Sequence, residues 1–123
     1  MKLLYLVLGG AAGTVSRYVL SAAIHENAGH GFPYGTLAVN GLGCLVVGLL
    51  STLHGGRFFL DENMKMLLAV GFCGAFTTFS TFIFETAHLA KGEGVWHALA
   101  NVVLSLCVGV LAFILGRRLG RLL

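Results

Sequence analysis

Four long apolar segments limit what this chain can fold into more than any other feature of its sequence. They cover approximately residues 3–24, 33–54, 66–90 and 95–116, and each reaches or exceeds the ~20 residues with which an α-helix crosses a hydrocarbon core. A soluble domain could not hide so much apolar surface, because small domains bury only ~60 to 70% of the surface that the unfolded chain exposes. The sequence therefore predicts an all-α membrane protein whose single domain, residues 1–123, contains four transmembrane helices.

The connections between these segments are short, and they comprise residues 26–32, 55–65 and 91–94. Loops of this length leave little room for a domain outside the membrane, so we expect the function to reside in the helices. Small residues recur within the segments, above all at Gly9, Gly10 and Gly13, and in lipid they let helix backbones approach closely. Four tightly packed helices enclose little space, so a water-accessible path through them favours a two-fold dimer.

Basic residues are unevenly distributed between the two ends of the predicted helices. If both termini lie on one side of the membrane, the other side holds Lys91 alone, whereas the side of the termini holds Lys2, Arg57, Lys65, Arg117, Arg118 and Arg121. By the positive-inside rule, this bias places both termini in the cytoplasm, in a multi-pass protein of the cell inner (plasma) membrane. The basic residues form no stripe, which argues against a nucleic-acid-binding protein.

The third segment sorts its hydroxyl and aromatic side chains onto different faces. At about 100° per residue, one helix face carries Thr77, Thr78, Thr81 and Glu85, and the roughly opposite face carries Phe72, Phe76, Phe79 and Phe82. Gly71 and Gly74 favour a break at membrane depth, because glycine lowers the cost of leaving helical geometry and threonine hydroxyls can satisfy the freed backbone groups. The alternative is an unbroken helix whose Ser and Thr hydroxyls bond back to its own carbonyls.

Polar side chains inside the other segments each allow two interpretations. Arg17 lies in the first segment, where a charge at the helix centre costs ~2.5 to 3.5 kcal/mol, so it either pairs with a partner or extends to the membrane surface. Asn40 and Thr36 lie one turn apart in the second segment, and they either line a path or bond helix to helix. Asn101 and Ser105 repeat this spacing in the fourth segment, where they either extend the path or tie helices together.

Three motifs carry information beyond the apolar pattern. They are Gly-x-x-Gly-x-x-x-Arg-Tyr at Gly10 to Tyr18, Gly-Thr-Leu-Ala-Val-Asn-Gly-Leu-Gly at Gly35 to Gly43, and Gly-Phe-Cys-Gly-Ala-Phe-Thr-Thr-Phe-Ser-Thr-Phe at Gly71 to Phe82. Together they resemble the Fluc (CrcB) fluoride channel family, and the resemblance covers nearly the whole chain. It implies a fluoride-selective passive channel that exports fluoride and relieves its toxicity. It also implies an antiparallel, dual-topology-type dimer in which the third helix is broken mid-membrane.

The resemblance further implies which residues line the fluoride pore: Asn40, Phe79, Phe82, Ser80, Thr81 and Glu85. Amide and hydroxyl groups offer hydrogen-bond donors to this small, strongly hydrated anion as its water is removed. The edge of a phenylalanine ring carries the positive part of the ring quadrupole, so an anion is better placed beside that edge than beside an alkyl wall. Hydroxyls and rings thus make two successive coordination surfaces for one anion.

The resemblance implies two further partners within the membrane. The backbone carbonyls of Gly74 and Thr77 match those that hold a structural sodium ion at the dimer centre, and Arg17 matches the first-helix arginine of the family. The second subunit is either an antiparallel copy of this chain, in a homodimer, or an oppositely oriented paralogue, in a heterodimer. The excess of basic residues on one side favours the paralogue.

Other classes of protein fit the sequence less well. A small multidrug-resistance-type transporter is also a dimer of four-helix subunits, but it needs a titratable carboxylate in the first helix, where this chain has Arg17 and no acid. A scaffold subunit would not require sorted phenylalanine and hydroxyl faces. Cysteines and histidines are scattered without ligand spacing, and the sequence has no Ser-His-Asp or paired-carboxylate arrangement, so we do not expect an enzyme.

Overall fold

The computed structural model describes residues 1–29, 31–53 and 60–123. Within these ranges every regular element is helical, which confirms the all-α prediction. The elements are α1 (Lys2–Ala28), α2 (Tyr34–Leu50), α3 (Glu62–Lys65), the π-helix η1 (Met66–Cys73), α4 (Gly74–Phe76), α5 (Phe79–Gly92) and α6 (Val95–Gly120). The third apolar segment is thus divided among three elements, η1, α4 and α5, whereas each of the other three segments forms one helix.

The described residues contain three helical runs that are long and apolar enough to cross a membrane, and these are Lys2–Ala28, Glu62–Gly92 and Val95–Gly120. The fourth apolar helix, α2, has 17 residues. A helix of this length is at the lower limit of the ~17 to 25 residues that span a bilayer. The structure therefore agrees with a membrane protein of four apolar helices, one of them short.

Several helix ends differ from their predicted positions. α2 was expected to continue to residue 54, but it stops at Leu50. The Ser51 and Thr52 hydroxyls donate to carbonyls of the last turn, at 2.6 and 2.8 Å, and such bonds compete with continuation of the helix. α1 and α6 run past their predicted ends, to Ala28 and Gly120.

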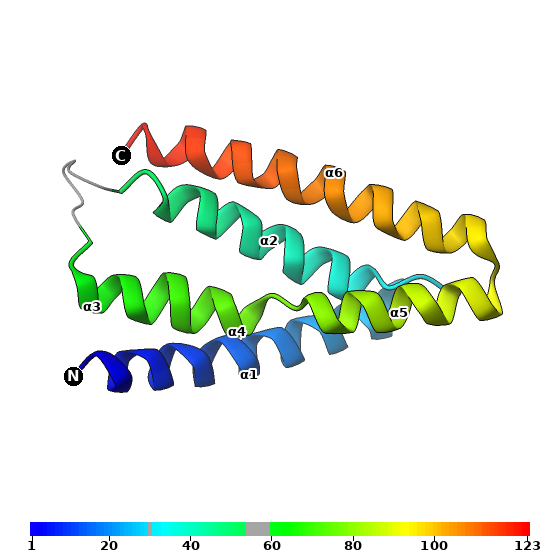
Figure 1. The fold of residues 1–123 in the computed structure, drawn as a ribbon, viewed down its shortest axis with the longest axis horizontal. Coiled ribbons are helices and arrows are strands. Elements are labelled where there is room, and N and C mark those ends of the chain that lie inside the picture. The colour runs from blue at the N-terminus through cyan, green and yellow to red at the C-terminus, as the bar shows by residue number, and fades with distance from the viewer. Residues whose placement is uncertain (30, 54–59) are drawn as a thin grey trace.

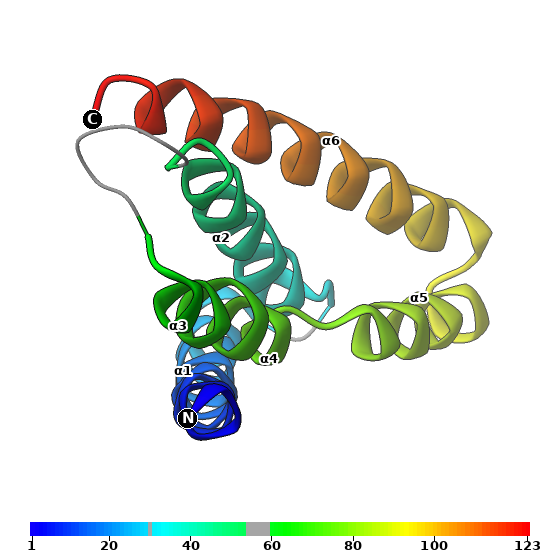
Figure 2. The same cartoon turned by 60° about the vertical axis from the view of Figure 1, so that its left-hand side comes forward.

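The long helices pack in two groups. α1 packs along η1 and α4, and α2 packs along α6. Gly94, with a φ of 98°, turns the chain from α5 into α6, so that these two helices lie together at one end of the molecule. Both chain termini lie at the other end (Figure 1), and α5 is set apart from α1 (Figure 2).

Glycines bring the backbones of both groups into contact. A Cβ atom on Gly9 or Gly13 would overlap carbonyl oxygens of η1. A Cβ atom on Gly48 or Gly116 would overlap carbonyl oxygens of the facing helix in the α2–α6 pair. The predicted close packing is therefore confirmed, and it places η1 directly against α1.

The described chain has a small core and a largely apolar surface. Leu50, Leu53 and Cys73 form a buried cluster. Large apolar side chains are exposed along the long helices, among them Leu3 on α1 and Val110 on α6. An apolar exterior of this extent suits a protein that is surrounded by lipid rather than by water.

Candidate functional site

The helix break lies at Thr77 and Thr78. α4 ends at Phe76 and α5 begins at Phe79, and the two residues between them are extended, with φ and ψ of −84° and 156° at Thr77 and of −148° and 118° at Thr78. The broken-helix interpretation is therefore confirmed, and the unbroken alternative is wrong. Gly74 does not supply the break through its conformational freedom, because it is helical, with φ and ψ of −62° and −36°.

Asn40 replaces backbone hydrogen bonds that are lost at the break. Its Oδ1 accepts the Thr78 N–H at 2.8 Å, and its Nδ2 donates to the Thr78 carbonyl at 3.0 Å. Gly43, one turn further along α2, makes this approach possible, because a Cβ atom there would overlap the Thr77 side chain. Asn40 therefore bonds α2 to the break in the third segment, and its role in the pore stays a prediction. These two bonds to Thr78 use only one of the two Nδ2 hydrogens of Asn40, so the other hydrogen can donate to a further acceptor.

Arg17 binds the backbone on the other side of the break. Its Nε donates to the Ala75 carbonyl at 3.1 Å, and the side chain is part-buried. Ala75 belongs to the last turn before the break, where carbonyls have lost their helical donors. Arg17 therefore pairs with protein, and the interpretation that it extends to the membrane surface is wrong.

Three hydroxyl groups meet at the start of α5. The Thr78 Oγ1 caps the helix by accepting the Thr81 N–H at 3.3 Å, and it donates to the Thr81 Oγ1 at 2.9 Å. The Ser80 Oγ lies 3.4 Å from the same Thr78 Oγ1. Ser80 and Thr81, predicted to share a hydroxyl track, are thus linked through Thr78, which the pore prediction did not include.

The phenylalanines form two pairs, one on each side of the break. Phe72 and Phe76 stack with ring centroids 5.4 Å apart. Phe79 and Phe82, the two predicted pore residues, lie 5.8 Å apart with their planes tilted by 40°. A single aromatic face along the whole segment, as predicted for a straight helix, is therefore wrong, because the extended residues change the register between the two halves.

Three cavities follow one another along α2. The first, of about 290 Å³, is lined by Asn40, Thr78 and Phe79 among others. The second, of about 370 Å³, is also lined by Thr78, together with Thr81 and Arg17. A third cavity of about 150 Å³ shares lining residues with the second and reaches Glu85. Most of the predicted pore residues are therefore brought to one succession of cavities.

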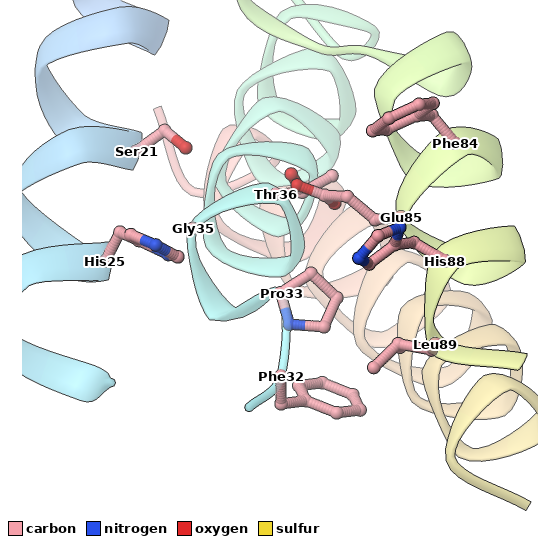
Figure 3. Close-up of a pocket in the computed structure, with 10 residues that line it drawn as sticks. All are labelled: Ser21, His25, Phe32, Pro33, Gly35, Thr36, Phe84, Glu85, His88 and Leu89. Atoms are coloured by element: carbon pink, nitrogen blue, oxygen red, sulfur yellow. The ribbon is translucent and has the colours of Figure 1, made fainter. Parts of the chain in front are cut away.

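The third cavity joins three helices (Figure 3). Ser21 and His25 project into it from α1, the buried Thr36 from α2, and Glu85 and His88 from α5. Within the described part of the chain, the Glu85 Oε2 is buried and has no hydrogen-bond partner.

Ser21 and His25 were not predicted as site residues. They continue from Arg17 at four-residue intervals along one face of α1, and this spacing is the sequence signal that could have identified them.

Asn101 and Ser105 lie on α6 and do not line these three cavities. Asn101 is 1% exposed and donates from its Nδ2 to the Thr86 Oγ1 at 2.8 Å. Thr86 in turn donates to the Phe82 carbonyl at 2.7 Å. Asn101 therefore ties α6 to α5, which confirms its helix-bonding interpretation, and Ser105 is half-buried on the same helix.

The carbonyls of Gly74 and Thr77 do not receive the N–H groups that would donate to them in a regular helix. In a continuous helix, the Thr78 N–H would donate to Gly74 and the Thr81 N–H to Thr77. Here the first donates to Asn40 and the second to the Thr78 side chain. Both carbonyls thus keep lone pairs for another partner, and carbonyl oxygens are suitable ligands for a monovalent cation. Among the described residues, no cluster of three His, Cys, Asp or Glu side chains could hold a metal.

Comparison with known proteins agrees with the motifs. The family model described as CrcB-like protein, Camphor Resistance (CrcB), matches residues 4–117. A protein of Magnetococcus marinus named "Fluoride-specific ion channel FluC" is 48% identical over 100% of both chains. Proteins of the same name from Solidesulfovibrio magneticus and Solibacter usitatus are 43% and 41% identical, over 99% and 98% of this chain and 98% and 99% of theirs. This chain belongs to the CrcB family.

Proposed function

We propose that this chain forms a fluoride-selective passive channel, and that it is neither an enzyme nor a multidrug transporter. Its full-length similarity to relatives named as fluoride-specific ion channels supports this function. The structural observation that carries the proposal is the succession of cavities that begins at Asn40 and Phe79 and reaches Glu85. A passive channel moves fluoride down its gradient, so it relieves a cell in which fluoride has accumulated.

Fluoride passes, in this proposal, between neutral donors and aromatic edges. The amide of Asn40 and the hydroxyls of Ser80 and Thr81 replace its water, and the edges of Phe79 and Phe82 complete the first part of the path. Neutral donors hold the anion without the fixed positive charge that would trap it. The Glu85 carboxylate marks the far end, where like charge favours release.

The functional channel is proposed to be an antiparallel dimer, because one subunit leaves the break uncovered. Phe79 is 74% exposed, and Gly74 and Ser80 are exposed beside it. A second subunit of opposite orientation would bring its own break to the same membrane depth and cover these residues. The excess of basic residues near the termini favours cytoplasmic termini in the inner membrane and an oppositely oriented paralogue as the second subunit.

A sodium ion at the dimer centre completes the proposal. Gly74 and Thr77 would hold it through the carbonyls that have lost their helical donors. A bound sodium ion supplies a positive charge that joins carbonyl dipoles from both subunits. Gly74 is exposed, and outside its own helix and chain neighbours no described atom lies within 4 Å of a Cβ atom placed there, so the surface at Gly74 has room for a second subunit.

Fluoride efflux from liposomes tests the proposed function. The purified protein is reconstituted into vesicles loaded with potassium fluoride, and a fluoride electrode records release after a potassium ionophore removes the opposing membrane potential. We expect rapid fluoride release, whereas vesicles loaded with chloride retain it. The measurement is repeated with the paralogue co-reconstituted, because the chain alone forms no antiparallel pair if its orientation is fixed. Fluoride retention under both conditions, with dimeric protein present, would show that the chain is not a channel.

A further inference from the structure

We propose that Asn40 is a positioning residue that holds the helix break open and so makes the Gly74 carbonyl available to a cation. Asn40 then has a second role besides any contact with fluoride, and this role couples the anion path to the cation site. The inference rests on the proposed sodium site, and it concerns how this chain builds that site from its own backbone.

The coupling follows from a competition for one N–H group. The Thr78 N–H can donate to one of two acceptors. In a continuous helix the acceptor is the Gly74 carbonyl, and in the broken helix it is the Asn40 Oδ1. In the structure it donates to Asn40, at 2.8 Å. Because one N–H cannot satisfy both acceptors well, the bond to Asn40 leaves the Gly74 carbonyl free.

The second half of the pair prevents Thr78 from returning to helical geometry. The Asn40 Nδ2 donates to the Thr78 carbonyl at 3.0 Å, so that both backbone groups of this residue are held by one planar amide. Thr78 is fixed in an extended conformation, with φ of −148° and ψ of 118°. That conformation also places the Thr78 hydroxyl as the cap of α5, where it removes the Thr81 N–H from the Thr77 carbonyl.

Asn40 itself is firmly placed by α2. Val39 beside it is 1% exposed, and Gly43 lies against the Thr77 side chain. Packing of α2 therefore fixes the Asn40 amide, and the amide in turn fixes the backbone of Thr78. A role restricted to binding fluoride would require only the remaining Nδ2 hydrogen and would have no effect on cation binding.

Two substitutions separate the positioning role from a direct anion contact. Asn40→Leu removes both hydrogen bonds to Thr78, whereas Asn40→Asp keeps the acceptor for the Thr78 N–H and loses the donor. Asn101→Leu is the matched control, because it removes a buried amide that bonds α6 to α5 away from the break.

The readout is the sodium concentration at which the reconstituted protein, with its paralogue where one is needed, becomes dimeric in vesicles. Sodium chloride is titrated against N-methyl-D-glucamine chloride, and dimers are counted by single-molecule photobleaching. We expect Asn40→Leu to raise the half-maximal sodium concentration at least about tenfold, as the loss of a buried hydrogen-bonded group would. Asn101→Leu should stay near the wild-type value. Asn40→Asp keeps only one of the two bonds to Thr78, so its half-maximal sodium concentration should fall between those of the wild type and Asn40→Leu. Asn40→Asp should also slow fluoride efflux, because it adds a negative charge to the path.

Hydrogen exchange of the segment that contains Thr78 provides a second readout that does not depend on dimer counting. In the wild type and in Asn40→Asp the Thr78 amide should be protected, and in Asn40→Leu it should exchange at least about tenfold faster. Wild-type sodium dependence and wild-type protection in Asn40→Leu would overturn the inference. If the wild type dimerises without sodium, both the proposed cation site and the inference are wrong. If the wild type needs sodium and Asn40→Leu needs no more of it than the wild type, only the inference is wrong.

Discussion

Phe76 and Phe79 lie on opposite sides of the break, and their surroundings differ sharply. Phe76 is 6% exposed, stacked on Phe72 and packed in the half of the segment that contacts α1. Phe79 is 74% exposed, although it pairs with Phe82. The same residue type therefore stabilises a single subunit in one half and remains open to a partner in the other.

The difference between the halves reflects what holds each of them. The half before the break is fixed by backbone contact, because Gly9 and Gly13 let α1 approach η1 until no Cβ atom fits between them. The half after the break contacts chiefly α6, and side-chain hydrogen bonds rather than close backbone packing hold its start. One half can thus fold within the subunit, whereas the other is completed by assembly.

The largest expected effect tests the half of the third segment before the break, which is packed against α1 and is called the packed half below. Gly13→Val places a side chain where the Phe72 carbonyl lies, so we expect the fold to lose about 3 kcal/mol or more, because two backbones would have to separate. The matched control is Gly10→Val, since outside the surrounding turns of α1 no described atom lies within 4 Å of a Cβ atom at Gly10. The fraction of monodisperse protein after heating in detergent measures the difference. Equal behaviour of the two variants would contradict the contrast between the halves.

Removal of the Arg17 guanidinium should have the next largest effect. Arg17→Met leaves the Ala75 carbonyl without its donor, and hydrogen bonds to charged groups contribute ~1.5 to 3 kcal/mol. We expect lower thermal stability for this variant and nearly unchanged stability for Arg118→Met, which alters an exposed arginine at the end of α6. Equal stabilities would mean that Arg17 does not hold the packed half at the break.

Substitution of the two phenylalanines should separate stability from conduction. Phe79→Ile removes the aromatic edge from the proposed path, and we expect fluoride efflux to fall at least about tenfold while the subunit stays folded. Phe76→Ile instead disturbs a buried stack, so it should lower thermal stability and leave efflux per folded dimer unchanged. The electrode assay and a melting curve on the same samples measure both quantities, and a reversed outcome would assign the two halves the opposite roles.

The local composition of the third segment could predict the presence of the break but not how it is made. The cluster of hydroxyls and glycines in the third segment indicated a weak helix, and the break is there. The glycines were the wrong cause, because Gly74 is helical and a Cβ atom on Gly71 would crowd the α1 backbone. The deciding bonds join Asn40 to Thr78, which are 38 positions apart, and no local pattern reports a contact at that separation.

The pore residues show the same limit. Resemblance to a known family selected six pore residues. The structure brings Asn40, Phe79, Thr81 and Glu85 to neighbouring cavities, whereas Phe82 and Ser80 do not line them. The face calculated for a straight helix failed, since two extended residues rotate α5 relative to the turns before it. Ser21 and His25 on α1 share a helix face with Arg17, but only the structure shows that this face lies toward α5.

The smallest expected effect tests the bond between α5 and α6. Asn101 donates to Thr86, so a double-mutant cycle with Asn101→Leu and Thr86→Val should give a coupling free energy of ~0.6 kcal/mol, the average for hydrogen bonds between membrane helices. Thermal stability of the two single variants and the double variant measures it. A coupling above ~1.7 kcal/mol would exceed that range and mean that α6 holds α5 more strongly than a hydrogen bond between membrane helices usually does. A value near the average leaves α5 dependent on a second subunit, because a bond this weak cannot hold an exposed aromatic pair in place by itself.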